Sequence, residues 1–383
     1  MSVLFINCTG ETFTPANSGA ISTWVYELCR AAERDGARPL VITRSSQHPQ
    51  YDRAGTMFID YPRLEWGRAM RKYFHLQERM AGWAHPRHRR WFELVAGAIV
   101  GAGAQNMPMV LSNDPELAVW LRERFPKAFI FHQAQNTNAS PNRFRCRFGA
   151  SVNVAAACSN FAARWNEQYF GLGSGVIHTL YNGVDVDAFR PAESASCTRP
   201  VVNFVGKTDP IKGPDLLLMA AKVLRLRTRE FSVQIVGRKF YDREHEDSYQ
   251  RELRRLGSEL VASGIEVDFK GWASRSALPA VLTRAHIHVT PSRWEEPFGM
   301  TTLEAMACGL ATIGSRTGGT PEVIGEGGLL FEREDVAGLA DRLEQFVLDG
   351  ERRLQYAKRA RERAAEFSWA KVWKRLKTLI GLT

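Results

Sequence analysis

The stretch PSRWEEPFGMTTLEAMACG at residues 291–309 lies in the most informative part of the sequence. It follows the apolar run IHVT at residues 287–290, which predicts a buried strand that ends at Pro291. A loop through Gly299 comes next, and a helix is expected to begin near Met300. A strand, a loop and a covering helix in this order are typical of a parallel sheet.

The same alternation of strand-length and helix-length segments extends in both directions from this stretch. In the first half it predicts a helix at residues 21–33 and strands at 3–6, 39–43, 109–112, 128–132 and 152–157. In the second half it predicts strands at residues 201–205, 233–237, 267–271, 287–290, 311–314 and 328–331, with helices at 215–225, 301–307, 321–324 and 335–348.

The alternation stops at a polar segment, residues 189–200, which indicates a domain boundary. We therefore expect an α/β protein with two Rossmann-like doubly wound domains, residues 1–190 and 191–366. A closing helix at 367–383 is expected to pack back toward the first domain. Ligands of open α/β sheets lie at the carboxyl ends of the strands. The expected site is thus a cleft across which the two domains face each other.

Composition limits the classes of function. The chain has 383 residues, more than twice the ~150 residues typical of one domain. Its net charge of +10 favours anionic partners, such as nucleic acid, an acidic membrane surface or phosphorylated small molecules. The apolar run at residues 94–104 is too short for the ~20 residues of a membrane-spanning helix. With no export signal and six scattered cysteines, we expect a cytoplasmic protein without disulfides or zinc.

Three loops carry residues that suit phosphate. The first turn of a helix presents unpaired N–H groups and partial positive charge, and Gly299 lets a ligand approach the helix that follows it. Lys207 and Lys212 come directly after strand 201–205, where two ammonium groups would hold a diphosphate. The third loop, GGTPE at residues 318–322, places a threonine N-cap before a short helix. Each signal is also typical of an ordinary solvated loop or a tight turn.

Two carboxylates flank the expected helix start. Glu296 lies in the loop, and Glu304 lies about one turn into the helix. They can border one ligand from different sides, and neither is expected to be required by the fold. Because acids are common in early helical turns, a purely structural role for Glu304 stays open.

Residues 291–309 resemble the E-x7-E signature of the family 4 retaining glycosyltransferases, which have the GT-B fold. The likeness covers nearly the whole second domain and is thinner in the first. It implies transfer of a sugar from a nucleotide-diphosphate donor with retention of anomeric configuration by front-face attack. Further segments that match the family are YNGVD at 181–185, FRP at 189–191, FVGK at 204–207, KG at 212–213, GGTPE at 318–322 and FSW at 367–369.

The resemblance implies roles for residues of the second domain. Glu304 would accept hydrogen bonds from the ribose hydroxyls, and Glu296 would contact the donor sugar. Lys207 and Lys212 would bind the diphosphate, with Lys207 standing where the family usually has arginine. The backbone at the helix start would hold sugar and phosphate oxygens through Phe298, Gly299, Met300, Thr301 and Thr302.

In the first domain the resemblance implies two contacts. Gly19 follows Ser18 where the family often has a Gly-Gly turn near the diphosphate, and His132, expected just after its strand, matches a histidine near the sugar. A satisfied loop histidine is the alternative. The expected catalytic residues are Glu296, His132 and Lys212. No metal and no cofactor beyond the nucleotide-sugar co-substrate are expected, because lysines and a helix N-terminus can stabilise the departing diphosphate.

Basic and aromatic residues alternate from Arg68 to Trp91. We expect them on the acceptor side, where they would contact an anionic membrane surface or an anionic glycan; a solvated basic helix is the alternative. Arg143, Arg145 and Arg147 form a second such cluster. We therefore expect a glycan or lipid-linked acceptor, a peripheral place at the inner face of the plasma membrane, and a role in polysaccharide or lipopolysaccharide biosynthesis.

Other functions stay open. Nucleic-acid binding would use the same arginines and aromatic rings, but no recognised nucleic-acid module is visible, so no nucleic-acid partner is expected. The chain lacks the three-glycine fingerprint of NAD-dependent oxidoreductases. A glycoside hydrolase that used Glu296 and Glu304 would have no use for the two lysines. Nucleotide-sugar epimerases and phosphorylases share the expected fold, so fold alone does not establish transfer.

Overall fold

The structure is a computed structural model, and it describes residues 2–8, 10–15, 19–61, 86–137, 145–192, 199–238 and 247–382. The chain forms two compact units, Met1–Asn182 with Trp369–Thr383, and Gly183–Ser368. The boundary expected after residue 190 thus lies too late in the chain. Residues 183–190 belong to the second unit because the Arg361 guanidinium donates to the carbonyl oxygens of Val186 and Phe189, at 2.8 and 2.7 Å.

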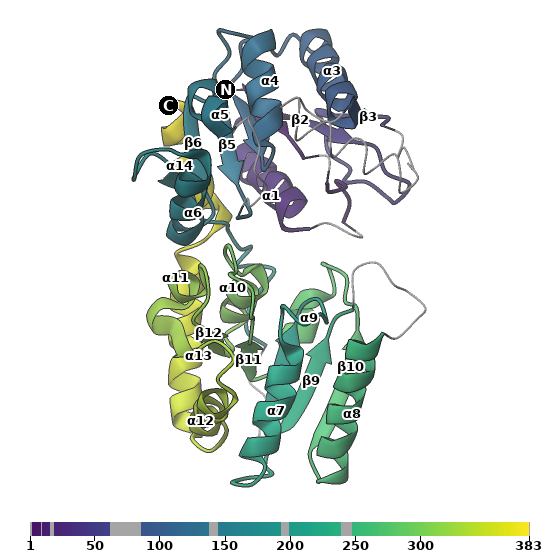
Figure 1. Cartoon of the computed structure of the whole chain (residues 1–383), viewed down its shortest axis with the longest axis vertical. Helices are drawn as coiled ribbons and strands as arrows, with labels where there is room; N and C mark the ends of the chain where they lie inside the picture. The colour runs from purple at the N-terminus through teal and green to yellow at the C-terminus, as the bar shows by residue number, and fades with distance from the viewer. Residues whose placement is uncertain are drawn as a thin grey trace. The chain divides into compact units, whose positions relative to one another are not determined.

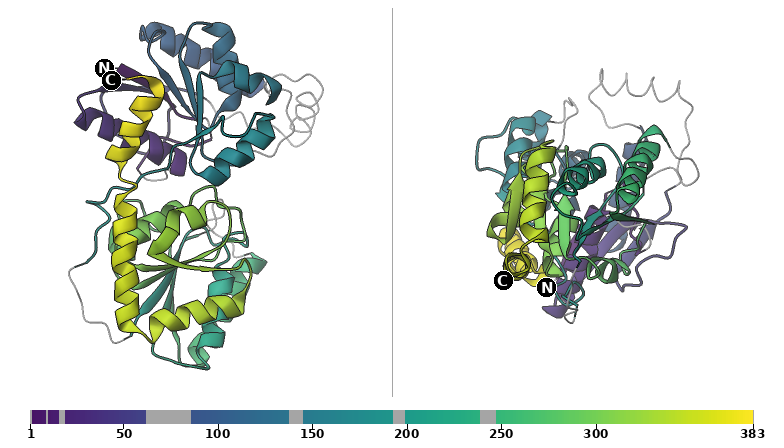
Figure 2. Two further views of the ribbon diagram at one scale, coloured as in Figure 1. Left: turned by 90° about the vertical axis from the view of Figure 1, so that its left-hand side faces the viewer. Right: turned by 90° about the horizontal axis from the view of Figure 1, so that it is seen from below.

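The first unit is built on a parallel sheet with strand order β3-β2-β1-β4-β5-β6-β7 (Figure 1). Strand order reverses its direction between β1 and β4, as in doubly wound folds. In the interior strand β1, residues 3–6 are all apolar and buried, as expected where helices cover both faces of the sheet (Figure 2). The strands are β1 (Ser2–Ile6), β2 (Arg38–Arg44), β3 (Thr56–Ile59), β4 (Met109–Ser112), β5 (Ile130–Ala134), β6 (Val154–Ala157) and β7 (His178–Thr179).

Polar side chains start two of the helices in this unit. Asp114 accepts a hydrogen bond from the backbone N–H of Leu117 at 3.0 Å, and Ser159 accepts one from Ala162 at 2.9 Å. Such caps satisfy N–H groups that the helix leaves without a partner. The helices are α1 (Ala20–Arg34), α3 (Pro86–Gly101), α4 (Pro115–Arg124), α5 (Arg145–Ser151) and α6 (Asn160–Phe170).

The closing helix α14 (Trp369–Ile380) packs in the first unit against α1. Trp373 and Leu376 are buried, and both the Trp373 indole and the Lys377 ammonium donate to Asp35, at 2.9 and 2.6 Å. Hydrogen bonds from Lys377 and Trp373 lower the pKa of Asp35. The two ends of the described chain therefore lie in the same unit.

The second unit has a six-stranded parallel sheet with order β10-β9-β8-β11-β12-β13. Its strands are β8 (Val201–Val205), β9 (Ser232–Val236), β10 (Glu266–Gly271), β11 (Ile287–Thr290), β12 (Ala311–Ser315) and β13 (Gly328–Phe331). Its helices are α7 (Pro214–Leu224), α8 (Ser248–Ala262), α9 (Leu278–Leu282), α10 (Met300–Ala307), α11 (Thr320–Ile324), α12 (Val336–Val347) and α13 (Gly350–Ala365). Every strand that the sequence predicts is present, within two residues at each end.

Close backbone contacts join the loops at the carboxyl edge of this sheet. Gly213 has φ 67°, and a Cβ atom there would lie 2.1 Å from the carbonyl oxygen of Pro291. A Cβ on Gly237 would lie 1.7 Å from the carbonyl oxygen of Gly206. Only glycine lets these chains approach so closely. The loops after β8, β9 and β11 are therefore packed backbone to backbone.

Gly213→Ala is expected to destabilise the second unit by about 2 kcal/mol more than Gly264→Ala. Both glycines have positive φ, 67° and 91°, so both alanines carry the left-handed strain of about 1–2 kcal/mol. Only the Gly213 variant adds a clash, because no atom of the described residues lies within 4 Å of a Cβ on Gly264. Chemical unfolding of the two variants measures the difference, and equal losses would contradict the close packing.

Candidate functional site

Three loops meet at the carboxyl edge of the second sheet, following β8, β11 and β12. The Ile211 carbonyl oxygen in the first loop accepts from the backbone N–H groups of Arg293 and Trp294 in the second loop, at 2.8 and 3.0 Å. The third loop is joined to the second because the N–H of Gly319 donates to the carbonyl oxygen of Glu296 at 2.6 Å. These bonds assemble the sequence-predicted loops into one site.

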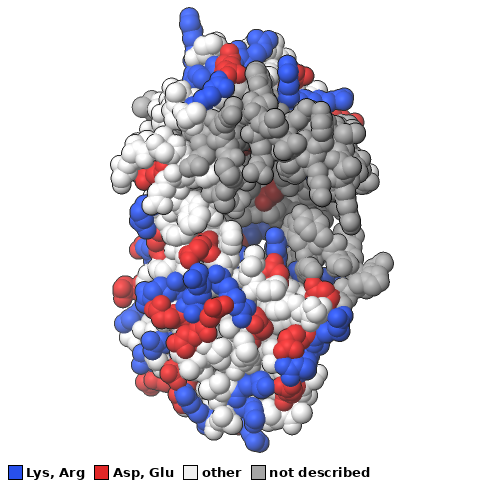
Figure 3. Space-filling model, in the orientation of Figure 1, with Lys and Arg blue, Asp and Glu red and all other residues white. Residues whose placement is uncertain are grey.

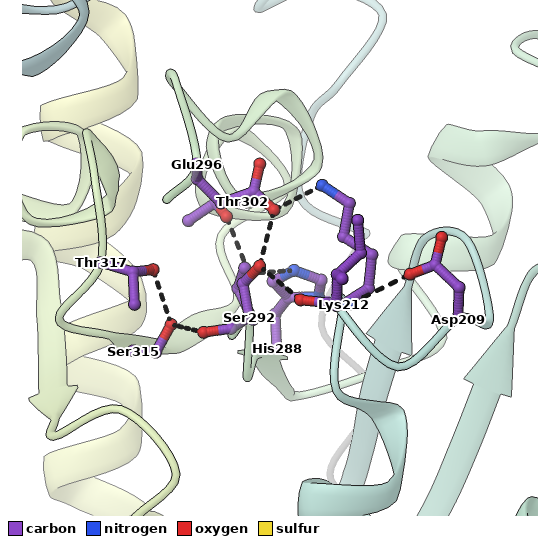
Figure 4. Close-up of polar contacts among 10 residues, drawn as sticks. Asp209, Lys212, His288, Ser292, Glu296, Thr302, Ser315 and Thr317 are labelled. Carbon is purple, nitrogen blue, oxygen red and sulfur yellow. Dashed lines mark hydrogen bonds and ion pairs between the residues drawn. The ribbon is translucent and has the colours of Figure 1, made fainter. Parts of the chain in front are cut away.

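Lys212 and Glu296 meet at this site. The Lys212 ammonium lies 2.5 Å from Glu296 Oε1, and the hydroxyl of Ser292 lies 2.9 Å from the same oxygen (Figure 4). The Glu296 side chain is 9% exposed and that of Lys212 is 26% exposed. The ion pair is thus partly shielded from water, which strengthens it. Ser292 is a member of the site that the sequence analysis did not single out.

The helix α10 begins beside this pair. Its N-cap is Gly299, with φ 99°, and no side chain of the described residues caps it. Phe298 is buried with its ring edge-on to Phe367, and the Thr302 hydroxyl bonds to that of Thr290 at 2.7 Å. The Phe298 and Thr302 side chains thus contact other parts of the second unit. The groups that α10 presents to the site are therefore the backbone N–H groups of its first turn.

A buried polar chain supports the start of α10. His288 Nδ1 lies 2.8 Å from the Asn203 side-chain oxygen, and His288 Nε2 lies 3.2 Å from the Thr290 hydroxyl, which in turn bonds to Thr302 (Figure 4). Burial lowers the pKa of His288 to about 3, so the ring is neutral. This chain links β8, β11 and α10 without bringing a charge into the core.

Glu304 is fully buried and is not a solvated acid of a helical turn. One carboxylate oxygen accepts a hydrogen bond from Arg275, and the other, Oε2, is buried without a partner among the described residues. Burial raises the pKa of Glu304, and the Arg275 guanidinium opposes that rise. Arg275 itself lies over the ring of Phe189, 5.3 Å from its centroid. An orphaned acceptor of this kind is rare in a folded core.

The loop after β12 differs from its prediction in one respect. Gly319, and not Thr320, is the N-cap of α11, and Thr320 is buried inside the helix. Gly318 has φ 53°, and a Cβ there would lie 2.2 Å from the carbonyl oxygen of Glu296. This loop therefore supports Glu296 through its backbone. Lys207, in the loop that follows β8, is exposed.

Two predicted site residues lie in the first unit. His132 is inside β5 and not after it, because the strand runs to Ala134. It is buried edge-on against Phe148, burial lowers its pKa to about 3, and its Nε2 has no partner within the described part of the chain. Gly19 is the N-cap of α1, where the Glu11 carboxylate accepts from the N–H of Ser22 at 2.8 Å. Ser18 lies outside the described residues.

Most of the predicted basic stretches lie outside the described residues, which omit 62–85 and 138–144 as well as the side chains of Arg87 and Arg145. Arg89 and Arg90 are exposed, and Arg89 pairs with Glu93 at 3.2 Å. Arg147 pairs with Glu123. The positive charges of Arg89 and Arg147 are therefore partly neutralised by these glutamates.

Within the described ranges, no three His, Cys, Asp or Glu side chains are grouped closely enough to hold a metal ion. The sequence Asp185-Val186-Asp187 forms a turn in which Asp185 accepts from the backbone N–H groups of Asp187 and Ala188, both at 3.1 Å. None of the helices so described is both long and apolar enough to cross a bilayer.

Two family models match the chain. "Glycosyltransferase Family 4" matches residues 21–188, and "Glycosyl transferases group 1" matches residues 185–363. Spore coat protein SA of Bacillus subtilis (strain 168) is 28% identical over 68% of this chain and 74% of its own length. A D-inositol 3-phosphate glycosyltransferase of Corynebacterium jeikeium (strain K411) is 33% identical over 50% of this chain. The match spans only 48% of that relative's length.

Solved structures show the same fold along the whole chain. Sucrose-phosphate synthase from Thermosynechococcus elongatus has a TM-score of 0.75 at 20% identity, with 99% of this chain and 98% of that one covered. The Anabaena protein Alr3699/HepE in complex with UDP and glucose has a TM-score of 0.72 at 17% identity, with both chains covered completely. At these identities the likeness concerns the fold.

Proposed function

The chain belongs to the family 4 glycosyltransferases and has their GT-B fold. We therefore propose that it binds a nucleotide-diphosphate sugar at the carboxyl edge of the second sheet. The observation that carries the proposal is the Lys212–Glu296 pair, held by Ser292 beside the uncapped start of α10. Positive charge and unpaired N–H groups at one place suit a phosphate. Lys207, exposed in the loop that follows β8, is the second cation of the proposed diphosphate site.

Glu296 and Glu304 take different parts of the donor in this proposal. Glu296 contacts the sugar hydroxyls. The Lys212 ammonium contacts both the Glu296 carboxylate and the diphosphate. Glu304 accepts hydrogen bonds from the ribose, and its Oε2, which has no partner in the part of the chain that the structure describes, supplies an acceptor for them. A bound ribose would replace or supplement the hydrogen bond from Arg275, which now holds the other oxygen.

The proposed reaction retains the anomeric configuration without a metal. Breaking the bond between the anomeric carbon and the diphosphate places negative charge on the leaving group, which Lys207, Lys212 and the start of α10 stabilise. The departing phosphate takes the proton of the acceptor hydroxyl, so no separate general base is needed in the second unit. We further propose that His132, neutral and buried in β5, forms a hydrogen bond with a sugar through its Nε2, which has no partner among the described residues.

We propose that the acceptor is a glycan or a lipid-linked molecule and that it binds to the first unit. We also propose that the protein is located at the inner face of the plasma membrane. The exposed Arg89 and Arg90 support an anionic acceptor or lipid headgroup. A basic nucleic-acid-binding protein is less well supported. Lys and Arg are interspersed with Asp and Glu over the described residues of the face in Figure 3, whereas nucleic-acid binding needs clustered positive charge.

The proposal predicts that one of UDP, GDP and ADP raises the melting temperature of the chain. A ligand at 100 times its dissociation constant adds about 2.7 kcal/mol to the free energy of unfolding. UDP is the first choice because it is bound in a structure that this chain resembles in fold. The matching nucleoside monophosphate serves as the control, and should shift the melting temperature less at equal concentration. If none of the three diphosphates stabilises the chain, the donor site is wrongly assigned.

A further inference from the structure

The guanidinium of Arg293 joins the two loops that carry Lys212 and Glu296. Its Nη1 and Nη2 donate to the two carboxylate oxygens of Asp215, at 2.8 and 2.7 Å, and Nη1 also donates to the carbonyl oxygen of Pro210 at 2.9 Å. Its Nε donates to Glu334 at 3.0 Å. A two-pronged contact of this kind fixes orientation as well as distance.

These contacts hold the backbone on both sides of Lys212. Pro210 precedes Lys212, and Asp215 follows it in the first turn of α7. Between them, the Ile211 carbonyl oxygen accepts from the backbone of Arg293 and Trp294. Arg293 therefore holds this segment through both its side chain and its backbone, and the Trp294 backbone and the Ser292 hydroxyl add hydrogen bonds to the same Ile211 oxygen.

The Asp215 side chain is itself fixed. Tyr249 from α8 donates its hydroxyl hydrogen to Asp215 Oδ1 at 2.5 Å. Burial opposes the charge on Asp215, but hydrogen bonds from Arg293 and Tyr249 outweigh it and lower the pKa of Asp215. The Arg293 and Asp215 side chains are 24% and 12% exposed, so the pair is shielded from water. Lysine in place of Arg293 would keep the charge but lose the planar fork.

We propose that Arg293 is a positioning residue that sets the place of the Lys212 ammonium against Glu296 and the donor diphosphate. It acts through the 210–215 backbone and does not touch the donor. This inference rests on the proposed function, because it assigns Arg293 a part in diphosphate binding by Lys212. If Arg293 served only the stability of the second unit, its loss would lower the melting temperature and leave affinity for the nucleotide unchanged.

A double-mutant cycle separates these roles. The dissociation constant is measured by calorimetry for whichever of UDP, GDP and ADP binds the unmodified chain most tightly. The variants are Lys212→Ala, Arg293→Ala, the double variant, and Arg293→Lys in case the alanine variant does not fold. We expect about 30-fold weaker binding for Lys212→Ala and about tenfold for Arg293→Ala, with Arg293→Lys between Arg293→Ala and the unmodified chain. The double variant should bind within about threefold of Lys212→Ala alone.

Arg227→Ala is the matched control. Arg227 also bridges two acids of the second unit, Asp341 and Glu344, at 2.7 and 2.8 Å, on the surface away from these loops. It should leave affinity unchanged. Losses that multiply in the double variant, or an Arg293→Ala or Arg293→Lys chain that binds as tightly as the unmodified one, would overturn the positioning role alone. Unchanged binding by Lys212→Ala, or no binding of any of the three nucleotides, would overturn the proposed function as well.

Discussion

Replacing Lys212 by alanine is expected to lower kcat for sugar transfer by about 100- to 1,000-fold, or about 3–4 kcal/mol in the activation free energy. The ammonium lies at Glu296, in a partly shielded site beside the start of α10. There it can oppose the negative charge that grows on the departing diphosphate. The charge is needed most in the transition state, so kcat should fall more than KM rises.

The rate is measured as release of the nucleoside diphosphate from its sugar conjugate. Lys222→Ala is the matched control, because Lys222 on α7 also pairs with a glutamate, Glu259, at 2.6 Å. That pair is on the surface and contributes at most about 1 kcal/mol to stability, so the control should keep the full rate. Circular dichroism shows whether the Lys212 variant is folded. A folded Lys212→Ala chain with more than about a third of the normal rate would place the diphosphate elsewhere.

Replacing Glu304 by alanine is expected to weaken nucleoside diphosphate binding by about 100-fold and to remove most of the turnover. A hydrogen bond to a charged group contributes about 1.5–3 kcal/mol, and the ribose offers two hydroxyls. The acceptor that would be lost is the buried Glu304 Oε2, for which the described ranges of the chain offer no hydrogen-bond partner. Glu304→Gln keeps the shape and one acceptor oxygen, so it should fall between the alanine variant and the unmodified chain.

The raised pKa of Glu304 adds a pH dependence. As the pH falls through that pKa, the carboxylate gains a proton and accepts hydrogen bonds less strongly, so nucleotide affinity should fall. Stability has the opposite sign: the folded chain binds this proton more tightly than the unfolded chain, so the Glu304 contribution to unfolding free energy falls as the pH rises through the same window. Glu304→Gln should remove both dependences.

Calorimetry between pH 5 and 8 measures this dependence. Glu259→Gln is the matched control, since Glu259 is a half-buried, ion-paired glutamate of the same unit. It should show the same pH profile as the unmodified chain. An unmodified chain and a Glu304→Gln chain with equal affinities at every pH would contradict the ribose role.

Some helices could not be predicted from the apolar pattern. In α13 the only described buried residues are Ala360 and Ala364, so the helix presents no stripe of large apolar side chains. The edge strand β7 has two residues, too few for a period to appear. These elements form because neighbouring elements provide a surface, which a single-sequence pattern does not contain.

Some residues of the candidate site could likewise be named from the sequence, and others could not. Lys212, Glu296 and Glu304 could be named from the sequence because each follows a strand or opens a helix, and because they match a family signature. Arg275 could not be named, since nothing near residue 275 marks it as the partner of a glutamate 29 positions later. Arg293 stands within the motif that the analysis quoted, but its partner Asp215 is 78 positions away.

The two parallel sheets, the loops at their carboxyl ends and the family could all be predicted from the amino-acid sequence, because strand and helix periods and glycine positions are local properties of the chain. The three ion pairs of the site become visible in the folded chain alone: Lys212 with Glu296, Arg275 with Glu304, and Arg293 with Asp215. Ion pairs and burial depend on distances across the fold, and strand order sets those distances. A charge whose partner lies far along the chain carries no local mark of that partner.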